Sequence, residues 1–310
     1  ALALQDYIGE WEVICVDDRS TDRTKEILEN FAKTHNRFKV LSLPIDLPPI
    51  ESPKKRALES AFKIAKNDIL LTIDADCIPK KSWITSMAGR FVDGIAIVQG
   101  PKQNNGSRTM PHLYQKLETL GYTAMEAAGF SFGHPLVASA ACLAYKKELF
   151  FAVGGFGDLV HLSSGDDDML IHKMLKIPGT KVCYNLDKDA VIETAPVHTW
   201  KALFNQRARW SSNGTNYESL WYVFLLTLIY TYYVWMFLSP WFVLFFDFSW
   251  KLCVFSILPK IIIDFIFLSI ASYKLQTKKR MLAFLPVELI QIPMIVFAVP
   301  AGITGLFKWK

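Results

Sequence analysis

Two aspartates stand one residue apart where a strand is expected to end. The apolar run Ile69–Ile73 predicts a short buried strand, and Asp74 and Asp76 follow it directly. Because alternate residues of a strand point to the same side, both carboxylates can face one ligand. Oxygen ligands of this kind suit Mg²⁺ or Mn²⁺, which proteins often share with substrate phosphates. Taken alone, such a pair is more often a solvated acidic turn.

A second acidic group lies at the expected start of a helix. Asp166, Asp167 and Asp168 are adjacent and precede a short apolar run. The free N–H groups and the dipole of a helix start would partly offset their mutual repulsion. Crowded acids tend to have raised pKa values, which suits one of them to act as a general base. An acidic helix start without a catalytic role fits the same pattern.

Further charged residues follow other strand or helix boundaries. Asp17 and Asp18 come directly after the apolar strand predicted over Trp11–Val16, in a loop position where open α/β sheets bind ligands. Lys54 is the first of three cations at the start of a helix, where the helix dipole favours anions instead. An anionic ligand near this helix start would explain the placement. Capping residues and a solvated basic turn are the alternatives.

A helical run near residue 200 carries a third kind of polar group. Gln206, Arg209 and Trp210 are spaced i, i+3 and i+4, so they share one face of that helix. Arginine can clamp a phosphate, and tryptophan offers a flat surface for a sugar or a base. An Arg-Trp helix end just before a membrane segment is also typical of an interfacial anchor.

The last third of the chain differs from the rest in composition. Three stretches, 220–246, 252–273 and 282–307, are apolar and long enough to cross a bilayer, and prolines predict a kinked, tilted or partly re-entrant third one. From Ser219 onward there are eight Lys or Arg and three acids, so this segment holds the whole net charge of +5. The pattern favours a membrane-flanking role and argues against binding to nucleic acid.

The basic residues also predict an orientation. Lys278–Arg280 marks the loop between the second and third stretches as cytosolic, and two spans then place the soluble part in the cytosol too. The predicted protein is therefore integral to a membrane, the cell inner membrane, with a cytosolic catalytic domain. Lys260 and Asp264, four residues apart in the second span, are expected to neutralise each other. Lys308 and Lys310 follow the third stretch and would lie outside if that stretch crosses fully, against the usual bias of basic residues toward the cytosol. The sequence therefore leaves open on which side of the membrane the C-terminus lies.

Strand and helix patterns alternate up to residue 76, which implies an α/β fold with a parallel sheet. The predicted domains are residues 1–216, soluble, and 217–310, in the membrane. The chain begins on what looks like the tail of a helix, so we expect that a first strand precedes it and is missing here. The five cysteines show no paired metal-ligand spacing.

In this order, the motifs resemble those of the family 2 glycosyltransferases, which are membrane-bound inverting enzymes with a GT-A (Rossmann-like) nucleotide-sugar domain. Val16–Asp22 looks like the first acidic motif, and Lys54–Leu58 looks like the Lys-x-x-Ala-Leu segment near the diphosphate. Asp74–Asp76 looks like the metal-binding Asp-x-Asp. Gly165–Asp167 resembles the motif whose last Asp is the catalytic base. Gln206–Trp210 matches the Gln-x-x-Arg-Trp of processive members, such as cellulose and hyaluronan synthases.

The resemblance implies a role for each motif residue. A divalent cation, Mg²⁺ or Mn²⁺, is the implied cofactor, and Cys142 stands where many members have Asn. The implied site residues are Asp167 and Asp166 for catalysis; Asp17, Asp18, Lys54 and Asp74 for the nucleotide sugar; Asp74 and Asp76 for the metal; and Gln206, Arg209 and Trp210 for the acceptor or product.

The implied activity is inverting transfer of a sugar from a nucleoside-diphosphate sugar to a polysaccharide or lipid at the cytosolic membrane face. The partners would be that donor, a glycan or lipid acceptor, and membrane lipids. Two other functions share part of the pattern: a catalytically silent membrane scaffold that retains a nucleotide pocket, and a metal-dependent nucleotidyl- or phosphotransferase. The first function releases nucleoside diphosphate, the scaffold yields no product, and the nucleotidyltransferase releases pyrophosphate.

Overall fold

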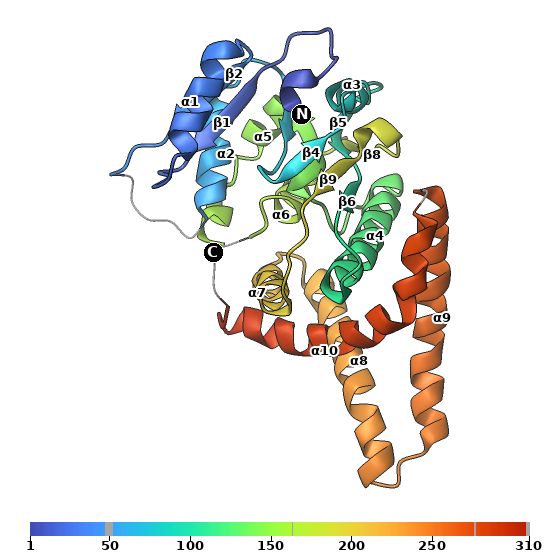
Figure 1. The fold of residues 1–310 in the computed structure, drawn as a ribbon. Helices are drawn as coiled ribbons and strands as arrows, with labels where there is room; N and C mark the ends of the chain where they lie inside the picture. Colours follow the sequence, from blue (N-terminus) through green and yellow to red (C-terminus); the bar gives the residue numbers. More distant parts are fainter. Residues whose placement is uncertain (47–51, 163, 276, 308–310) are drawn as a thin grey trace. The chain divides into compact units, whose positions relative to one another are not determined.

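The structure is a computed structural model of the 310-residue chain, and it describes residues 1–46, 52–162, 164–275 and 277–307. The chain forms two compact units (Figure 1). The first unit comprises residues 1–103 and 125–194, and the second comprises residues 104–124 and 195–310. The helix α4 (Met110–Ser131) contributes to both. The domain boundary predicted at residue 216 stays a prediction.

The first unit begins with a parallel pair of strands. β1 (Val13–Asp17) pairs with β2 (Phe38–Ser42), and α1 (Thr24–Thr34) connects them. The next helix, α2 (Pro53–Ile64), starts with proline at its first position, where the missing N–H costs no helical hydrogen bond. This part of the fold has the strand-helix-strand-helix order predicted from the sequence.

The larger sheet of the first unit is mixed. Its strand order is β3 (Ile69–Thr72), β7 (Leu143–Lys146), β5 (Ile95–Gln99) and β8 (Lys181–Tyr184). β7 runs antiparallel to both of its neighbours, whereas β5 and β8 are parallel. The prediction of a parallel sheet is therefore correct for β1 and β2 but wrong for β3. The partner of β3 comes about 70 residues later in the chain, beyond the alternating pattern that suggested the parallel arrangement.

Smaller elements complete the first unit. A three-stranded sheet has the order β4 (Cys77–Pro79), β9 (Ile192–Thr194) and β6 (Lys102–Asn104). The remaining helices are α3 (Trp83–Ala88), α5 (Lys147–Ala152), α6 (Asp168–Met174) and the 3-10 helices η1 (Leu2–Leu4), η2 (Ala140–Cys142), η3 (Gly157–His161) and η4 (Lys188–Ala190).

The core of this unit lies between α2 and the mixed sheet. Phe62 on α2 packs edge-to-face against Tyr145 on β7, with 5.9 Å between ring centroids. Leu70 on β3 and Ile97 on β5 are buried in the same cluster. Burying an apolar side chain of this size stabilises a fold by about 1.5–3 kcal/mol. The cluster therefore fixes α2 and the ends of β3 and β5, from which the polar motifs extend.

Long helices make up most of the second unit. They are α7 (Trp200–Ser211), α8 (Leu220–Phe245), α9 (Trp250–Lys274) and α10 (Phe284–Ile303), with the 3-10 helix η5 (Lys278–Ala283) before α10. Within the described residues, three segments are long and apolar enough to cross a membrane: 220–245, 250–274 and 281–303. They match the three predicted spans. Lys308 and Lys310 lie outside the described residues, as do the side chains of residues 278–280.

The three apolar helices are not equivalent. α8 and α9 form a hairpin, and α10 packs against both α8 and α7 (Figure 1). About a third of the most apolar window of α10 is buried, 33%, compared with 6% for α9. Gly302 allows the close approach of α10 to α7, because a Cβ atom there would collide with the Ala208 carbonyl and lie 3.0 Å from the Ser211 Cβ. Of the three helices, α9 therefore has the most apolar surface that the rest of the chain leaves uncovered.

Candidate functional site

The first turn of α2 presents three basic side chains in three directions. Lys54, Lys55 and Arg56 are consecutive, so they project from the helix about 100° apart. Each binds a different segment of the first unit. Two of these side chains, Lys54 and Arg56, contact the acidic motifs of the sequence.

Lys54 joins two of those motifs. Its Nζ lies 2.8 Å from Asp74 Oδ1 and 2.8 Å from Asp166 Oδ2. Burial alone would lower the pKa of Lys54, but the two carboxylates outweigh that effect and raise it. The loop after β3 and the loop before α6 therefore meet at one ammonium group, although about 90 residues separate them in the chain.

Asp167 lies beside this pair, at the start of α6. Its Oδ1 accepts the Asp168 backbone N–H at 2.9 Å, and its Oδ2 accepts the Ala140 N–H at 3.3 Å. Burial, followed by the negative charges of Asp166 and Asp168, raises the pKa of Asp167 well above its usual range. A carboxylate with a raised pKa binds a proton more readily, which is the property that a general base needs.

Two hydrogen-bonding side chains fix the segment to which Asp167 is bound. Thr72, at the end of β3, donates from its hydroxyl to the Ala140 carbonyl at 2.6 Å. The buried Gln99, at the end of β5, accepts the Ser139 N–H at 3.2 Å and donates to the Cys142 carbonyl at 3.0 Å. The ends of two strands therefore fix the backbone whose N–H group binds Oδ2 of Asp167.

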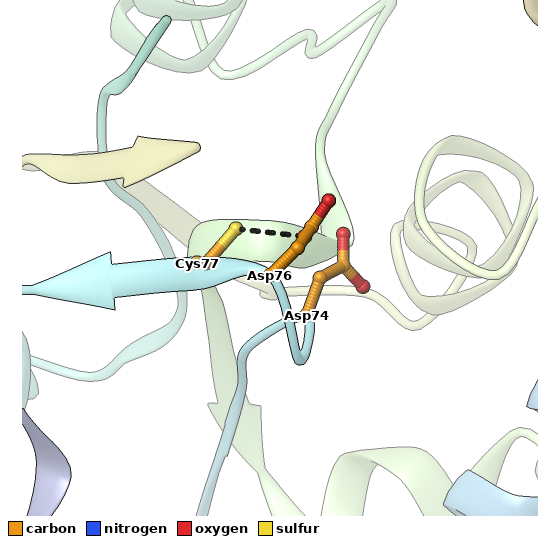
Figure 2. A group of neighbouring side chains, drawn as sticks. All are labelled: Asp74, Asp76 and Cys77. Carbon is orange, nitrogen blue, oxygen red and sulfur yellow. Dashed lines mark hydrogen bonds between the residues drawn. The ribbon is translucent and has the colours of Figure 1, made fainter. Parts of the chain in front are cut away.

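The turn between β3 and β4 could hold a metal ion. Among the described residues, Asp74, Asp76 and Cys77 each offer a ligand atom, and these atoms all lie within 4.8 Å of one another (Figure 2). Two carboxylates suit a hard cation such as Mg²⁺ or Mn²⁺, so the residues fit the implied cofactor. Burial and the nearby Asp74 raise the pKa of the Cys77 thiol to about 11. Mg²⁺ and Mn²⁺ prefer oxygen ligands to sulfur, so the two carboxylates are the better ligands for them than the thiol.

The predicted nucleotide residues Asp17 and Asp18 differ in their surroundings. Asp17 is buried, and its Oδ1 accepts the Ser20 N–H at 3.2 Å, so it stabilises the turn after β1. The Asp18 Oδ1 atom accepts hydrogen bonds from Arg56 of α2 at 3.1 Å and from Arg19 at 2.9 Å. Arg56 thus connects the first acidic motif to the helix that carries Lys54. Their contact with a nucleotide stays a prediction.

The Gln-x-x-Arg-Trp segment lies on α7, in the second unit. Arg207, which the sequence reasoning did not single out, donates from Nε to both carboxylate oxygens of Glu118 at 2.8 and 2.9 Å. Its guanidinium also covers one face of Trp210, at 4.2 Å from the ring centroid. Gln206 accepts a hydrogen bond from Arg207. The segment is therefore held rigidly, and the roles of Gln206, Arg209 and Trp210 toward an acceptor stay predictions.

Cys142 lies in the core rather than in a polar site. Its thiol accepts a hydrogen bond from the Trp83 indole N–H at 3.4 Å and donates to the Ala190 carbonyl at 3.3 Å. Burial raises its pKa to about 12. The apolar surroundings of Cys142 in the sequence are typical of a reduced core thiol, and the structure confirms that it is free and buried.

The structure thus brings Asp74 and Asp166 to Lys54 in the first unit, with Asp167 next to Asp166 and a carboxylate oxygen of Asp76 within 4.8 Å of one of Asp74. Sequence reasoning missed Lys55 and Cys77. The run of three cations was a signal for Lys55, but its acceptors are backbone carbonyls, which no motif reveals. Cys77 is adjacent to the Asp-x-Asp pair and was not considered because it has no second cysteine nearby.

Comparison with known proteins identifies relatives of this chain. Residues 1–152 match the model of the family described as "Glycosyl transferase family 2". A "Probable glycosyltransferase YdaM" from Bacillus subtilis (strain 168) is 24% identical over 220 residues, covering 67% of this chain and 49% of the relative. An "N-acetylglucosaminyltransferase" from Rhizobium meliloti (strain 1021) is 23% identical over 217 residues, covering 68% and 50%.

These matches confirm the family resemblance predicted from the motifs. The chain spans about half the length of the curated relatives it matches. Among solved structures, "Crystal structure of S. aureus TarS 1-349" is similar, with 17% identity and a TM-score of 0.44, over 98% of this chain and 86% of that one.

Proposed function

We propose that this chain, whose residues 1–152 belong to glycosyl transferase family 2, transfers a sugar from a nucleoside-diphosphate sugar to a glycan or lipid hydroxyl at a membrane surface. The observation that supports this most directly is the double contact of Lys54 with Asp74 and Asp166. It supports the proposal because it brings the Asp-x-Asp turn and the loop that leads into Asp167 to one ammonium group, where the diphosphate and the acceptor hydroxyl would have to meet.

The donor side would be bound by the turn after β3 and by α2. Asp74 and Asp76 would hold a divalent cation, which when bound neutralises the charge that develops on the departing diphosphate. Lys54 adds a second positive charge beside them. Asp18, held by Arg56, would contact the nucleotide from the end of β1.

The acceptor side would be served by Asp167. Its carboxylate takes the proton from the acceptor hydroxyl while that oxygen attacks the anomeric carbon, and the bond to the diphosphate oxygen breaks on the opposite face. Attack opposite the leaving group inverts the configuration. A well-placed general base contributes about 10²- to 10⁴-fold to the rate. Burial, followed by the charges of Asp166 and Asp168, keeps the pKa of Asp167 high, which suits this step.

Trp210 and Arg209, with Gln206, would bind the acceptor or product. The three apolar helices indicate membrane association, and we propose the inner membrane with the first unit in the cytosol. Because relatives carry the name N-acetylglucosaminyltransferase, a nucleotide sugar bearing N-acetylglucosamine is the first donor to test.

The test uses membranes that contain the chain, a panel of nucleotide sugars, and analysis of the products. We expect nucleoside diphosphate together with a new glycoside. A chelator should abolish transfer, and added Mn²⁺ or Mg²⁺ should restore it. Release of pyrophosphate would instead indicate a nucleotidyltransferase, and nucleotide binding without turnover would indicate a silent scaffold. Full activity in chelator would contradict the role given to Asp74 and Asp76.

A further inference from the structure

Lys55 is a fully buried lysine whose three ammonium protons all meet backbone carbonyls. Its Nζ donates to the carbonyls of Leu159 at 2.6 Å, Leu162 at 2.9 Å and Ser164 at 2.6 Å. A buried charge without such partners would be strongly destabilising. Burial lowers the pKa of Lys55 to about 8, so the ammonium form still predominates at neutral pH.

The three acceptors belong to the segment that leads into Asp166 and Asp167. This segment starts with η3 (Gly157–His161), and none of the residues in η3 is fully buried. Leu159 packs against the core only partly. Three hydrogen bonds from one ammonium therefore supply much of what fixes this backbone, since each charge-assisted bond is stronger than a neutral one.

Two neighbouring residues of α2 thus hold one loop by different groups. Lys54 binds the Asp166 side chain at 2.8 Å, whereas Lys55 binds the main chain just before it. The side-chain contact is partly exposed and lies where a diphosphate would come. The main-chain contact is closed to solvent, so a donor would leave it unchanged.

We propose that Lys55 is a positioning residue, which holds the backbone at Leu159, Leu162 and Ser164 and thereby places the Asp167 carboxylate for proton transfer. This role rests on the proposed function. Lys55 itself touches neither donor nor acceptor, so it acts through the loop. A displacement of about 1 Å at a reacting group can cost on the order of 10²-fold in rate.

The test compares Lys55→Met with Lys63→Met in the full chain in membranes. Methionine keeps much of the length of lysine but provides no donor. Lys63 is on the same helix, and its side chain is 62% exposed. We expect Lys55→Met to lower kcat by on the order of 10²-fold, with the donor KM within about threefold, because Lys54, Asp74 and Asp76 are untouched. Lys63→Met should match the unaltered chain.

Hydrogen exchange provides a readout that does not depend on turnover. In Lys55→Met, amides of residues 157–162 and 164–168 should exchange faster while those of β5 and β7 stay protected. Lys55→Gln retains two N–H donors and should recover part of the lost kcat and of the protection. If Lys55→Met does not accumulate as a folded protein, the glutamine variant gives the same comparison against Lys63→Met.

The outcomes separate this role from the proposed function. No transfer by the unaltered chain with any donor would overturn the proposed function, and this role with it. An active unaltered chain with an unchanged kcat in Lys55→Met would overturn the positioning role alone. A rise in donor KM equal to the fall in kcat, or faster exchange spread over the whole first unit, would also overturn it, because either result indicates general loss of structure.

Discussion

Each of the two units contains a lysine that bridges two carboxylates of the same unit. Lys54 lies 2.8 Å from both Asp74 and Asp166. Lys260, on the apolar helix α9, lies 2.9 Å from Asp264 and also pairs with Glu288 of α10. The two clusters have the same charges, one lysine with two carboxylates, so a difference in what they do must come from how each cluster is placed.

The two clusters differ in access and in what surrounds them. The Lys54 side chain is 40% exposed, compared with 12% for Lys260. Lys260 also lies 4.9 Å from the centre of the Tyr233 ring. Two more acids, Asp76 and Asp167, lie beside the Lys54 cluster. The comparison suggests that the closed cluster links two membrane helices, whereas the open one can exchange its contacts for those of a ligand.

The largest expected effect is a loss of transfer when the acid beside the Lys54 cluster is changed, which should have no parallel at the Lys260 cluster. Asp167→Asn should reduce transfer by about 10²- to 10⁴-fold, because the amide cannot accept the acceptor's proton. Metal-dependent nucleotide binding should remain, since Lys54, Asp74 and Asp76 are unchanged. The measurements are initial rates of transfer and nucleotide affinity. Asp158→Asn, at an exposed position in η3, is the matched control, and undiminished turnover in Asp167→Asn would remove the base assignment.

The next effect concerns stability and should belong to the Lys260 cluster. Lys260→Met leaves Glu288 as a buried charge without its lysine, and breaking such a pair costs about 3–5 kcal/mol. We expect a lower midpoint of unfolding in detergent, with unchanged activity per folded molecule. Lys251→Met, at the exposed start of α9, should have little effect. Replacing Lys260, Asp264 and Glu288 together by apolar residues should restore stability, and a failure to do so would contradict this account.

A smaller effect is expected when the open cluster loses its lysine. Lys54→Met should raise the donor KM by about tenfold, the value of one charge-assisted hydrogen bond to the diphosphate. Its free energy of unfolding should change by less than about 1 kcal/mol, since partly exposed ion pairs contribute little. Steady-state kinetics and denaturant titration measure the two quantities. If Lys54→Met destabilised the fold as much as Lys260→Met, the distinction between the clusters would fail.

The smallest effect is a shift in pH dependence. The raised pKa of Asp167 means that a larger fraction stays protonated at mildly acidic pH, so kcat should rise with pH through that pKa rather than through the usual range near 4. The positive charge of Lys54 lowers the pKa of Asp167. Lys54→Met should therefore move the pH range over which kcat rises to higher pH. Lys260→Met should leave it in place. If kcat rose over the same pH range in the unaltered chain and in both variants, Lys54 would not influence the pKa of Asp167 as expected.

Sequence patterns were sufficient for the local elements and for the order of the motifs. The apolar run before Asp74 is a strand, and the three apolar stretches are helices. Long-range pairing was less accessible, because alternation of apolar residues indicates a strand but carries no information about its partner. The antiparallel match of β3 with β7 is one example.

Contacts between distant segments follow the same rule. The i, i+4 spacing predicted the pairing of Lys260 with Asp264, but Glu288 belongs to another helix and was not expected. The partners of Lys55 are main-chain carbonyls, which every residue has, so the sequence cannot indicate them. The gathering of Asp74 and Asp166 could be predicted only because the motif order resembled a known family.

Gly302 has a mechanical consequence for the second unit. Where α10 crosses α7 at Gly302 there is no room for even a methyl group, so the backbones of the two helices lie very close together. Such close packing resists relative movement of the two helices at that crossing. A change of tilt in α10, such as a thinner or thicker bilayer would impose, must carry α7 along, together with the arginine and tryptophan at its end.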